Sequence, residues 1–504
     1  MSIATSFHNI PANSQTNTVN MFSLRRFLSK HQKKPISMYH TWAHETNITK
    51  ATPQFIVTRE NGFLPREDPL ESLPSEYAAL ENILQRMPLI KQDGKPGLLA
   101  EGKFGETVKK ELPLYDFSTV TDSALLMALF RDYTFAASSY LLEPCDLSQK
   151  KTGQFRHGRD HLPKNIAVPL LQISDKIKAK PFMEYAQSYA LYNYARKDKS
   201  KPIIYDNLRL IRQFSGLPSE SGFILVHVEM VSRSNTLVSN AIAALDAVKN
   251  NDRYEFDNAM AKCVSVMQEI NRSMETMWIR SSPADYLKFR TFILGTKNQE
   301  RIFPNGVIYE GTDDLSPRYY RGESGANDSI IPTVDNLLQL TAKMPKNDMT
   351  NILKDFRTYR PENHSDWLTW VEQSANEVQL EKFAEKTPRS LSMYMLLTNE
   401  VRDFRARHWN FAKEYIIKRT AYPTATGGSP MATWLPNQLK VVLQTLQKKY
   451  EIYENMPNRN GEAIPPDFYK SVVAQLSRLS SEMEDISKMY NRYAKKTTVP
   501  EKAK

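Results

Sequence analysis

Apolar residues recur at helical spacing along most of the chain, and few segments alternate between apolar and polar residues as strands do. In the N-terminal half this pattern predicts a helix over residues 70–87. A second helix is expected to run toward Leu142, after Thr121-Asp122-Ser123, whose side chains can cap a helix start. The proline-bearing stretch 162–170 is expected to link two helices, because a proline favours an extended conformation in the residue before it.

The C-terminal half is more strongly helical. The spacing predicts helices over residues 223–248, 253–277, 332–344 and 391–417, and the glycines and prolines of residues 295–327 indicate a loop-rich stretch. A boundary between two parts of the chain is expected near residues 213–221, after the charged and turn-prone stretch 198–202. The sequence therefore predicts an all-α protein with long loops.

The C-terminal tail carries a heptad seam of apolar residues. Its members follow one another at alternating steps of three and four: Tyr469, Val472, Leu476, Leu479, Met483, Ile486, Tyr490 and Tyr493. Pro465-Pro466-Asp467 marks the expected start of this helix. We expect the seam to pack on the body of a monomeric protein, with self-association through residues 469–493 as the alternative.

Composition narrows the class of protein. The 504 residues include 41% hydrophobic and 24% charged residues, which is ordinary for a globular protein. Two cysteines are too few for a disulfide framework, which favours a cytoplasmic location. No apolar run is long enough to span a membrane, so no membrane partner is expected.

The net charge of +11 lies mainly at the two ends of the chain. Residues 1–44 contribute +5 and residues 486–504 another +5, which leaves the body almost neutral. A nucleic-acid site needs a basic surface on the folded part, so no nucleic-acid partner is expected. Residues 1–44 are interpreted as a disordered basic leader, with a mitochondrial targeting signal as the weaker alternative.

His408 is the first candidate for chemistry. It lies on a helical stripe that is otherwise apolar and consists of Leu397, Val401, Phe404, His408, Phe411 and Tyr415. Such a histidine is either hydrogen-bonded in a core or a metal ligand. No cysteine or carboxylate cluster accompanies it at zinc spacing, whereas haem needs only one proximal ligand from the protein. Arg405 and Arg407 could meet an anionic group such as a haem propionate.

Other candidates have an ordinary structural alternative. Arg290 is either a surface arginine or a clamp for a substrate carboxylate. The small-residue loop 321–328 could admit a flat ligand or could be a surface turn, and residues 426–429 could be a mobile flap or a linker. Phosphate-binding, dinucleotide-binding and serine-hydrolase motifs are absent from the sequence.

Five ordered blocks give the chain a family resemblance. They are Leu162–Pro169, Pro304–Gly311, Arg360–His364, Phe404–His408 and Thr426–Ser429. In order and spacing they resemble the indoleamine 2,3-dioxygenase family, in a fungal-type form. The resemblance spans roughly residues 55–445, so the leader and the heptad tail lie outside it.

The resemblance implies a fold with a small N-terminal helical domain and a larger C-terminal helical domain that binds haem. We therefore expect a leader at 1–44, a small domain at 45–215, a haem domain at 222–445 and an extra helical tail at 446–504. It also implies haem b as cofactor and L-tryptophan and O₂ as substrates. The implied reaction is cleavage of the indole 2,3 bond to give N-formylkynurenine, in a kynurenine pathway that feeds NAD biosynthesis.

Residue by residue, the resemblance implies His408 as the iron ligand. It places Arg405, Asp335 and Ala326 near the cofactor, and His227 and Ser324 at catalytic positions. The residues that it implies for substrate binding are Tyr185, Ser188, Phe223, Tyr286, Arg290, Gly325 and Thr426.

Several positions depart from the pattern of the family. His227 stands where the family commonly has Ser, and Tyr286 where it normally has Phe. Ser188 and Tyr189 replace smaller residues, Asn327-Asp328 replaces Gln-Ser, and Ser365 replaces Arg. These differences bear on substrate choice and turnover more than on haem binding. Two alternatives to a tryptophan dioxygenase therefore stay open: a haem protein with weak or altered indole activity, and a non-catalytic helical interaction protein.

Overall fold

The structure is a computed structural model that describes residues 48–343, 355–420, 425–428, 431–459 and 464–497, with side chains as far as Lys488. The expected leader, residues 1–44, lies outside the described residues. The described residues form one compact unit. The division of the chain at residues 215–222 stays a prediction.

The N-terminal part is built around one long buried helix, α5 (Ser123–Thr152). The Asp122 carboxylate accepts hydrogen bonds from the backbone N–H groups of Ala124 and Leu125, at 2.9 and 3.1 Å, which confirms the predicted cap. Packed on or near α5 are η1 (Ser75–Tyr77), α2 (Ala78–Arg86), α3 (Leu98–Glu101), α4 (Phe104–Glu111), α6 (Lys164–Ile177) and the π-helical turn η2 (Tyr185–Tyr189).

Two short strand pairs complete this part. Strand β1 (His161–Leu162) pairs in parallel with β4 (Ile308–Tyr309), and β2 (Tyr194–Arg196) pairs antiparallel with β3 (Leu208–Leu210). The turn η3 (Tyr205–Asn207) precedes β3. Because these strands are only two or three residues long, the fold is still all-α, as predicted.

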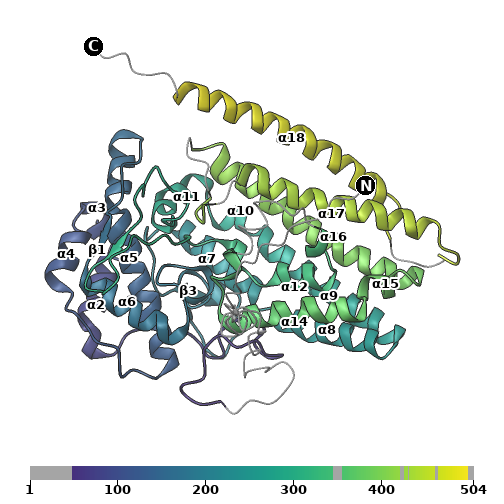
Figure 1. Ribbon diagram of the computed structural model, residues 1–504, viewed down its shortest axis with the longest axis horizontal. Coiled ribbons are helices and arrows are strands. Elements are labelled where there is room, and N and C mark those ends of the chain that lie inside the picture. The colour runs from purple at the N-terminus through teal and green to yellow at the C-terminus, as the bar shows by residue number, and fades with distance from the viewer. Residues whose placement is uncertain (1–47, 344–354, 421–424, 429–430, 460–463, 498–504) are drawn as a thin grey trace, which may run out of the picture. The chain divides into compact units, whose positions relative to one another are not determined.

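A stack of helices forms the C-terminal part. In chain order it contains α7 (Pro218–Val231), α8 (Ser234–Lys249), α9 (Arg253–Glu275), α10 (Met277–Arg280), α11 (Pro283–Arg290), η4 (Thr291–Ile293), η5 (Gly325–Asn327), α12 (Ile330–Leu337), η6 (Thr341–Lys343), α14 (Glu362–Val378), α15 (Leu380–Ala384), α16 (Pro388–Phe411), the π-helical turn η7 (Ala412–Ile417), α17 (Met431–Glu454) and α18 (Phe468–Thr497). Helices α8, α9, α16, α17 and α18 pack one on the next (Figure 1).

The seam of the tail helix packs on the body of the protein. Helix α18 starts directly after the predicted Pro465-Pro466-Asp467 signal and lies along α17 (Figure 1). Of the seam, Val472 and Leu479 are buried and Met483 is half-buried, whereas the side chains of Tyr490 and Tyr493 lie outside the described residues. Self-association through this helix stays an untested alternative.

Some predicted boundaries are wrong. Residues 162–170 do not link two helices, because α6 begins directly after Pro163 and contains Pro169 in its second turn. Pro163 occupies the cap position, where a missing N–H costs nothing, and Pro169 removes one backbone hydrogen bond from a helix held by packing. The helix predicted over 223–248 is broken at residues 232–233 into α7 and α8.

Two of the predicted helices are shorter than expected. The helix predicted over 332–344 is α12, which begins at Ile330 and ends at Leu337. The helix predicted from residue 70 begins only at Ser75. Among the described helices, none combines the length and the apolar character needed to cross a bilayer.

Candidate functional site

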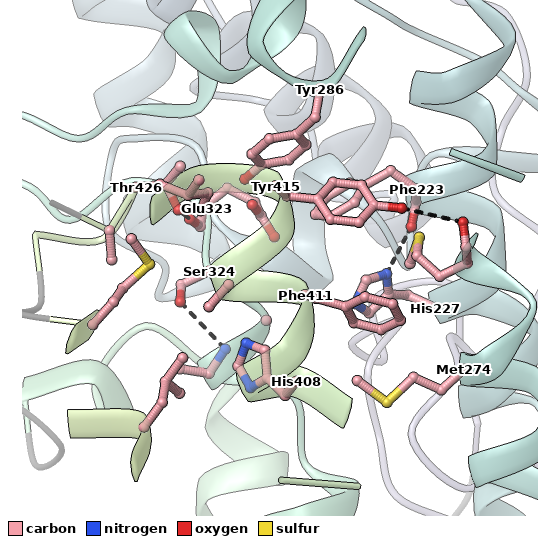
Figure 2. A pocket seen from close by; sticks show the side chains of 18 of the residues that line it. Phe223, His227, Met274, Tyr286, Glu323, Ser324, His408, Phe411, Tyr415 and Thr426 are labelled. Atoms are coloured by element: carbon pink, nitrogen blue, oxygen red, sulfur yellow. Dashed lines mark hydrogen bonds between the residues drawn. The ribbon is translucent and has the colours of Figure 1, made fainter. Parts of the chain in front are cut away.

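Two adjoining cavities lie beside α16, and His408 lines both. The first, of about 120 Å³, is mostly aromatic and aliphatic; the second, of about 90 Å³, is more polar. They share five lining residues: Gly325, Ala326, His408, Trp434 and Leu435. In Figure 2 His408 and Tyr286 lie at opposite ends of the first cavity, with Ser324 and His227 between them.

The stripe of α16 explains why His408 faces the cavities. Phe404 lines the second cavity, His408 lines both, and Phe411 and Tyr415 line the first. These residues follow one another at steps of four, three and four, so they share one helix face. The π-helical turn η7 continues this face beyond Phe411.

The imidazole of His408 lines both cavities and has no partner among the described residues. Within the described part of the chain its side chain makes no hydrogen bond or ion pair. Burial lowers its pKa to about 4, helped by the positive charges that His227 and Arg405 can carry, so the ring is neutral at pH 7. A neutral imidazole with a free nitrogen can bind a metal ion.

His227 faces the same cavity from α7. Its Nδ1 lies 2.7 Å from the carbonyl oxygen of Phe223, which can only accept, so Nδ1 carries the proton. The other ring nitrogen, Nε2, is therefore an acceptor, and burial lowers the pKa of the ring. A Cβ built on Gly325 would lie 3.7 Å from Nε2, which places that nitrogen at the small-residue loop.

The loop that carries Ser324 is fixed by close backbone packing. A Cβ on Gly322 would come within 2.3 Å of the Gly295 nitrogen, so only glycine allows these two segments to approach. Arg360 donates to the carbonyl oxygens of Ala326, Asn327 and Asp328, at 2.8, 3.0 and 3.1 Å. The Ser324 hydroxyl accepts a hydrogen bond from the Ala326 N–H at 3.3 Å and borders the first cavity.

Thr426 is part of the wall of the first cavity. Its hydroxyl donates to the Glu323 carbonyl oxygen at 2.5 Å, and its own carbonyl oxygen accepts from Gly295 N–H at 3.0 Å. Arg321 reaches the Gly427 carbonyl oxygen at 2.8 Å. Residues 425–428 are therefore tied to two loops rather than forming a simple linker.

The second cavity is lined by three arginines and two aspartates: Arg357, Arg360, Arg405, Asp328 and Asp335. Arg405 Nη2 donates to Asp335 Oδ2 at 2.6 Å across 70 residues of sequence. Burial raises the pKa of Asp335, and Arg405 opposes that rise. In the described structure the Arg405 Nε and Nη1 and the Arg360 Nη1 are buried without a hydrogen-bond partner.

These features fit a haem group. The described residues contain no group of three or more His, Cys, Asp or Glu side chains placed to hold a metal ion, whereas haem iron needs only one histidine. His408 supplies a neutral imidazole, the first cavity is apolar, and the second offers buried N–H groups suited to propionates. Gly325 and Ala326 contribute no side chain larger than a methyl group to the wall that the two cavities share.

Three of the expected substrate residues do not line either cavity. Ser188 is buried and its hydroxyl donates to the Glu184 carbonyl oxygen at 2.7 Å. Tyr185 lies behind His227, with ring centroids 5.8 Å apart. Arg290 is 2% exposed, which excludes the surface alternative, and its charge lowers the pKa of Tyr286 against the rise caused by burial.

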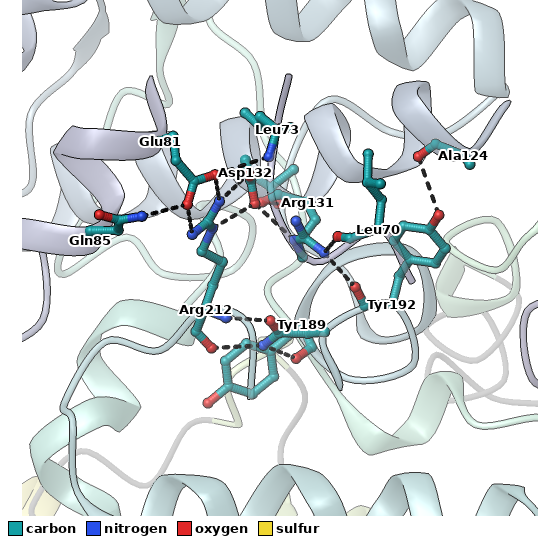
Figure 3. A network of polar contacts seen from close by, with 12 residues as sticks. Leu70, Leu73, Glu81, Gln85, Ala124, Arg131, Asp132, Tyr189, Tyr192 and Arg212 are labelled. Atoms are coloured by element: carbon teal, nitrogen blue, oxygen red, sulfur yellow. Dashed lines mark hydrogen bonds and ion pairs between the residues drawn. The ribbon is translucent and has the colours of Figure 1, made fainter. Parts of the chain in front are cut away.

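The segment that carries Tyr185 and Ser188 is anchored by a buried ionic network (Figure 3). Arg212 Nη2 contacts both Glu81 and Asp132, at 2.5 and 2.7 Å, and Arg131 contacts Asp132 at 2.8 Å. Burial alone would raise the pKa of Asp132, but the two arginines hold it below its usual value. Arg131 also donates to the Tyr192 carbonyl oxygen at 3.2 Å, which ties the network to this segment.

Sequence reasoning missed several of the residues that line the cavities. The missed residues are Met274, Met277, Glu323, Phe411, Tyr415, Trp434, Arg357 and Arg360. Phe411 and Tyr415 share the helical stripe of His408, and that signal could have identified them. Glu323 lies in the small-residue loop 321–328 and Arg360 opens the block 360–364, so both were near a signal. The others come from distant parts of the chain and carry no local signal.

Comparison with known proteins agrees with this geometry. The family described as indoleamine 2,3-dioxygenase matches residues 51–434, which is most of the chain. The chain belongs to the indoleamine 2,3-dioxygenase family. This assignment confirms the predicted resemblance and the all-α class. Members of the family are haem-dependent dioxygenases of tryptophan and related indoles.

Individual relatives within the family are distant. Indoleamine 2,3-dioxygenase 1 of Rattus norvegicus is 24% identical over 72% of this chain and 84% of its own length. An indoleamine 2,3-dioxygenase of Aspergillus nanangensis is 24% identical over 74% of this chain and 88% of its own. A 6-hydroxytryptophan 2,3-dioxygenase of Fusarium equiseti is 22% identical over 63% of this chain and 72% of its own. The family match ends at residue 434, before α18 begins.

Proposed function

We propose that the protein binds haem b through His408 and inserts O₂ across the indole 2,3 bond of L-tryptophan to give N-formylkynurenine. The observation that carries this proposal is the unpartnered imidazole at the meeting point of an aromatic cavity and an arginine-lined cavity. Haem would supply the iron chemistry that activates O₂. The product would feed a kynurenine pathway toward NAD, and we expect the enzyme to act in the cytoplasm.

The side chains of the first cavity would bind and orient the indole. Phe223 and Tyr286, whose ring centroids are 5.2 Å apart, offer aromatic surfaces. His227 Nε2 could accept a hydrogen bond from the indole N–H. The apolar lining would exclude water, which strengthens every polar contact that the substrate makes there.

Charged side chains would hold the cofactor and the carboxylate of the substrate. Arg405 and Asp335, with Arg360 behind the small-residue loop, would hold the cofactor on the side of the second cavity. Arg290, which acts on Tyr286, would orient the carboxylate of the substrate, and Thr426 would fix the wall of the first cavity.

Turnover by the haem-loaded protein tests the proposal. The full chain is incubated with haem b, a reductant, O₂ and L-tryptophan, and N-formylkynurenine is measured by absorbance and mass spectrometry. We expect a Soret band and steady product formation. A protein without a Soret band after haem addition would contradict the cofactor, and a haem-loaded protein without product would contradict the substrate.

A modified indole is the second candidate substrate. The observation in its favour is the relative of Fusarium equiseti, which is named for 6-hydroxytryptophan. Competition between L-tryptophan and 6-hydroxytryptophan in one assay separates the two. A kcat/KM at least tenfold higher for the hydroxylated substrate would favour the second candidate.

A further inference from the structure

Glu323 brings a carboxyl group to the first cavity without a protein partner. The residue is 3% exposed and lines that cavity. No hydrogen bond or ion pair joins its carboxyl group to any other part of the described chain. Burial is the sole cause that raises its pKa, to about 8. A buried carboxyl group left alone in this way is costly, which points to a missing partner.

The backbone presents this carboxyl group from a fixed position. Thr426 donates to the Glu323 carbonyl oxygen at 2.5 Å, and the neighbouring Gly322 packs directly on Gly295. Figure 2 shows Glu323 beside Thr426, on the side of the cavity nearer Tyr286 than His408. The carboxyl group is therefore held away from the imidazole that would bind iron.

The lining of the first cavity offers no cation to Glu323. Its described members include no Lys or Arg and are mainly aromatic and aliphatic. Arg290 and Glu323 both act on Tyr286: burial raises the pKa of the phenol, Arg290 lowers it, and Glu323 raises it further. Arg290 and Glu323 thus act in opposite directions on one aromatic residue of the cavity. An amino acid carries a complementary pair of charges: its carboxylate could pair with Arg290 and its ammonium group with Glu323.

The geometry points to Glu323 as the residue that binds the α-ammonium group of the substrate. This inference rests on the proposed function, because it assigns a role within the same substrate cavity. A carboxylate and an ammonium group form a charge-assisted hydrogen bond, which is strong where water is excluded. Glu323 would then select amino acids and amines over indole carboxylic acids.

A comparison of two ligands tests the assignment. Dissociation constants of L-tryptophan and indole-3-propionic acid, which keeps the indole and the carboxylate but lacks the ammonium group, are measured on the haem-loaded protein by calorimetry. Glu323→Gln preserves the shape of the side chain and removes its charge. We expect this variant to raise the dissociation constant of L-tryptophan about 10- to 100-fold. The dissociation constant of indole-3-propionic acid should change by less than about twofold. Tryptamine has the ammonium group but no carboxylate, and its binding should be weakened as much as that of L-tryptophan.

Two further variants serve as controls. Asp146→Asn removes another buried carboxylate, which lies on α5 beside Lys150 and lines neither cavity, and it should leave both ligands unchanged. Glu323→Asp keeps the charge and should retain part of the preference for L-tryptophan. The Soret absorbance of each variant confirms that the haem-loaded fold is intact.

The outcomes separate this inference from the proposed function. An equal loss for both ligands would mean that Glu323 only packs, and this result would overturn the assignment alone. A wild-type protein that binds haem but neither ligand would overturn the proposed function together with it.

Discussion

Both the burial of His408 and its lack of a partner in the described structure favour a role in haem binding. The imidazole is neutral at pH 7, it has no hydrogen-bond partner in the described structure, and both cavities meet at its ring. A histidine that only filled a core would have a partner for at least one ring nitrogen. His408 is therefore the residue on which haem binding should depend.

We expect His408→Ala to abolish stable haem binding. The helix should survive, because Ala has a higher helix propensity than His. Soret absorbance measures the bound haem and far-ultraviolet circular dichroism measures the helix content. Asn410→Ala, at an exposed position of the same helix, is the control and should bind haem normally. Full haem occupancy with a histidine-ligated spectrum in His408→Ala would exclude His408 as the ligand.

Arg290 is expected to act on the substrate and not on haem. A charge-assisted pair with the carboxylate should contribute about 1.5–3 kcal/mol. Arg290→Ala should therefore lower kcat/KM about 10- to 150-fold with unchanged haem content. Lys288→Ala, an exposed position on the same helix α11, is the control and should have little effect. Normal turnover of L-tryptophan by Arg290→Ala would show that the arginine only supports Tyr286.

The two ring nitrogens of His227 have different surroundings. Nδ1 is engaged by the Phe223 carbonyl oxygen, so the residue packs, while Nε2 is left as an acceptor beside the cavity. His227→Ser should still bind haem and cleave L-tryptophan. It should weaken substrate capture by about 1 kcal/mol, the size of one neutral hydrogen bond. With 1-methyltryptophan, which has no indole N–H, the loss should vanish; an equal loss for both substrates would mean that His227 only packs.

At the scale of elements, the tail helix α18 is joined to the end of the helix that carries His408. Glu482 accepts hydrogen bonds from Trp409 Nε1 at 2.8 Å and Lys413 Nζ at 2.7 Å. Trp409 follows His408 directly, and Lys413 lies in the π-helical turn η7. Two contacts thus attach helix α18 to the segment 409–413, which directly follows His408.

Loss of this contact should loosen haem. We expect Glu482→Gln to speed haem release about two- to fivefold, a modest effect because the carboxylate is only half-buried. Transfer of haem to an excess of an apo-globin acceptor measures the release rate. Glu484→Gln, at an exposed position on the same helix, is the control. Equal release rates for the two variants and the wild type would show that α18 packs without influencing the site.

At the scale of the whole molecule, buried carboxyl groups should make stability depend on pH. Burial raises the pKa of Glu184 and of Glu323 to about 8 each. Between the ordinary pKa of Glu, near 4.5, and pH 8 the folded state binds more protons than the unfolded state. The contribution of these two groups to the free energy of unfolding should therefore fall as pH rises toward 8.

Urea unfolding of the haem-free protein at pH 6.5, 7.5 and 8.5 measures this slope. We expect Glu184→Gln and Glu323→Gln each to flatten it, because an amide does not titrate. Glu76→Gln, at the surface, is the control and should leave the slope unchanged. Slopes of Glu184→Gln and Glu323→Gln equal to that of the wild type would contradict the raised pKa values of the two carboxyl groups.

The sequence alone was sufficient for the features that depend on neighbours within one or two helical turns. The cap at Asp122, the start of α18 after Pro465-Pro466-Asp467 and the face of α16 that carries His408 follow from local spacing and local hydrogen bonding. The family resemblance added the identity of distant candidates such as Phe223 and Tyr286, both of which line the first cavity.

The tertiary structure decided whatever depends on residues far apart in the chain. The Arg405–Asp335 pair, the contacts of Arg360 with the small-residue loop and the joint of Glu482 with Trp409 each bridge more than 30 residues. The same holds for Glu323, whose burial without a partner results from loops brought together by Gly295, Gly322 and Thr426. Periodicity along one helix carries no information about such contacts, because they depend on how separate elements pack.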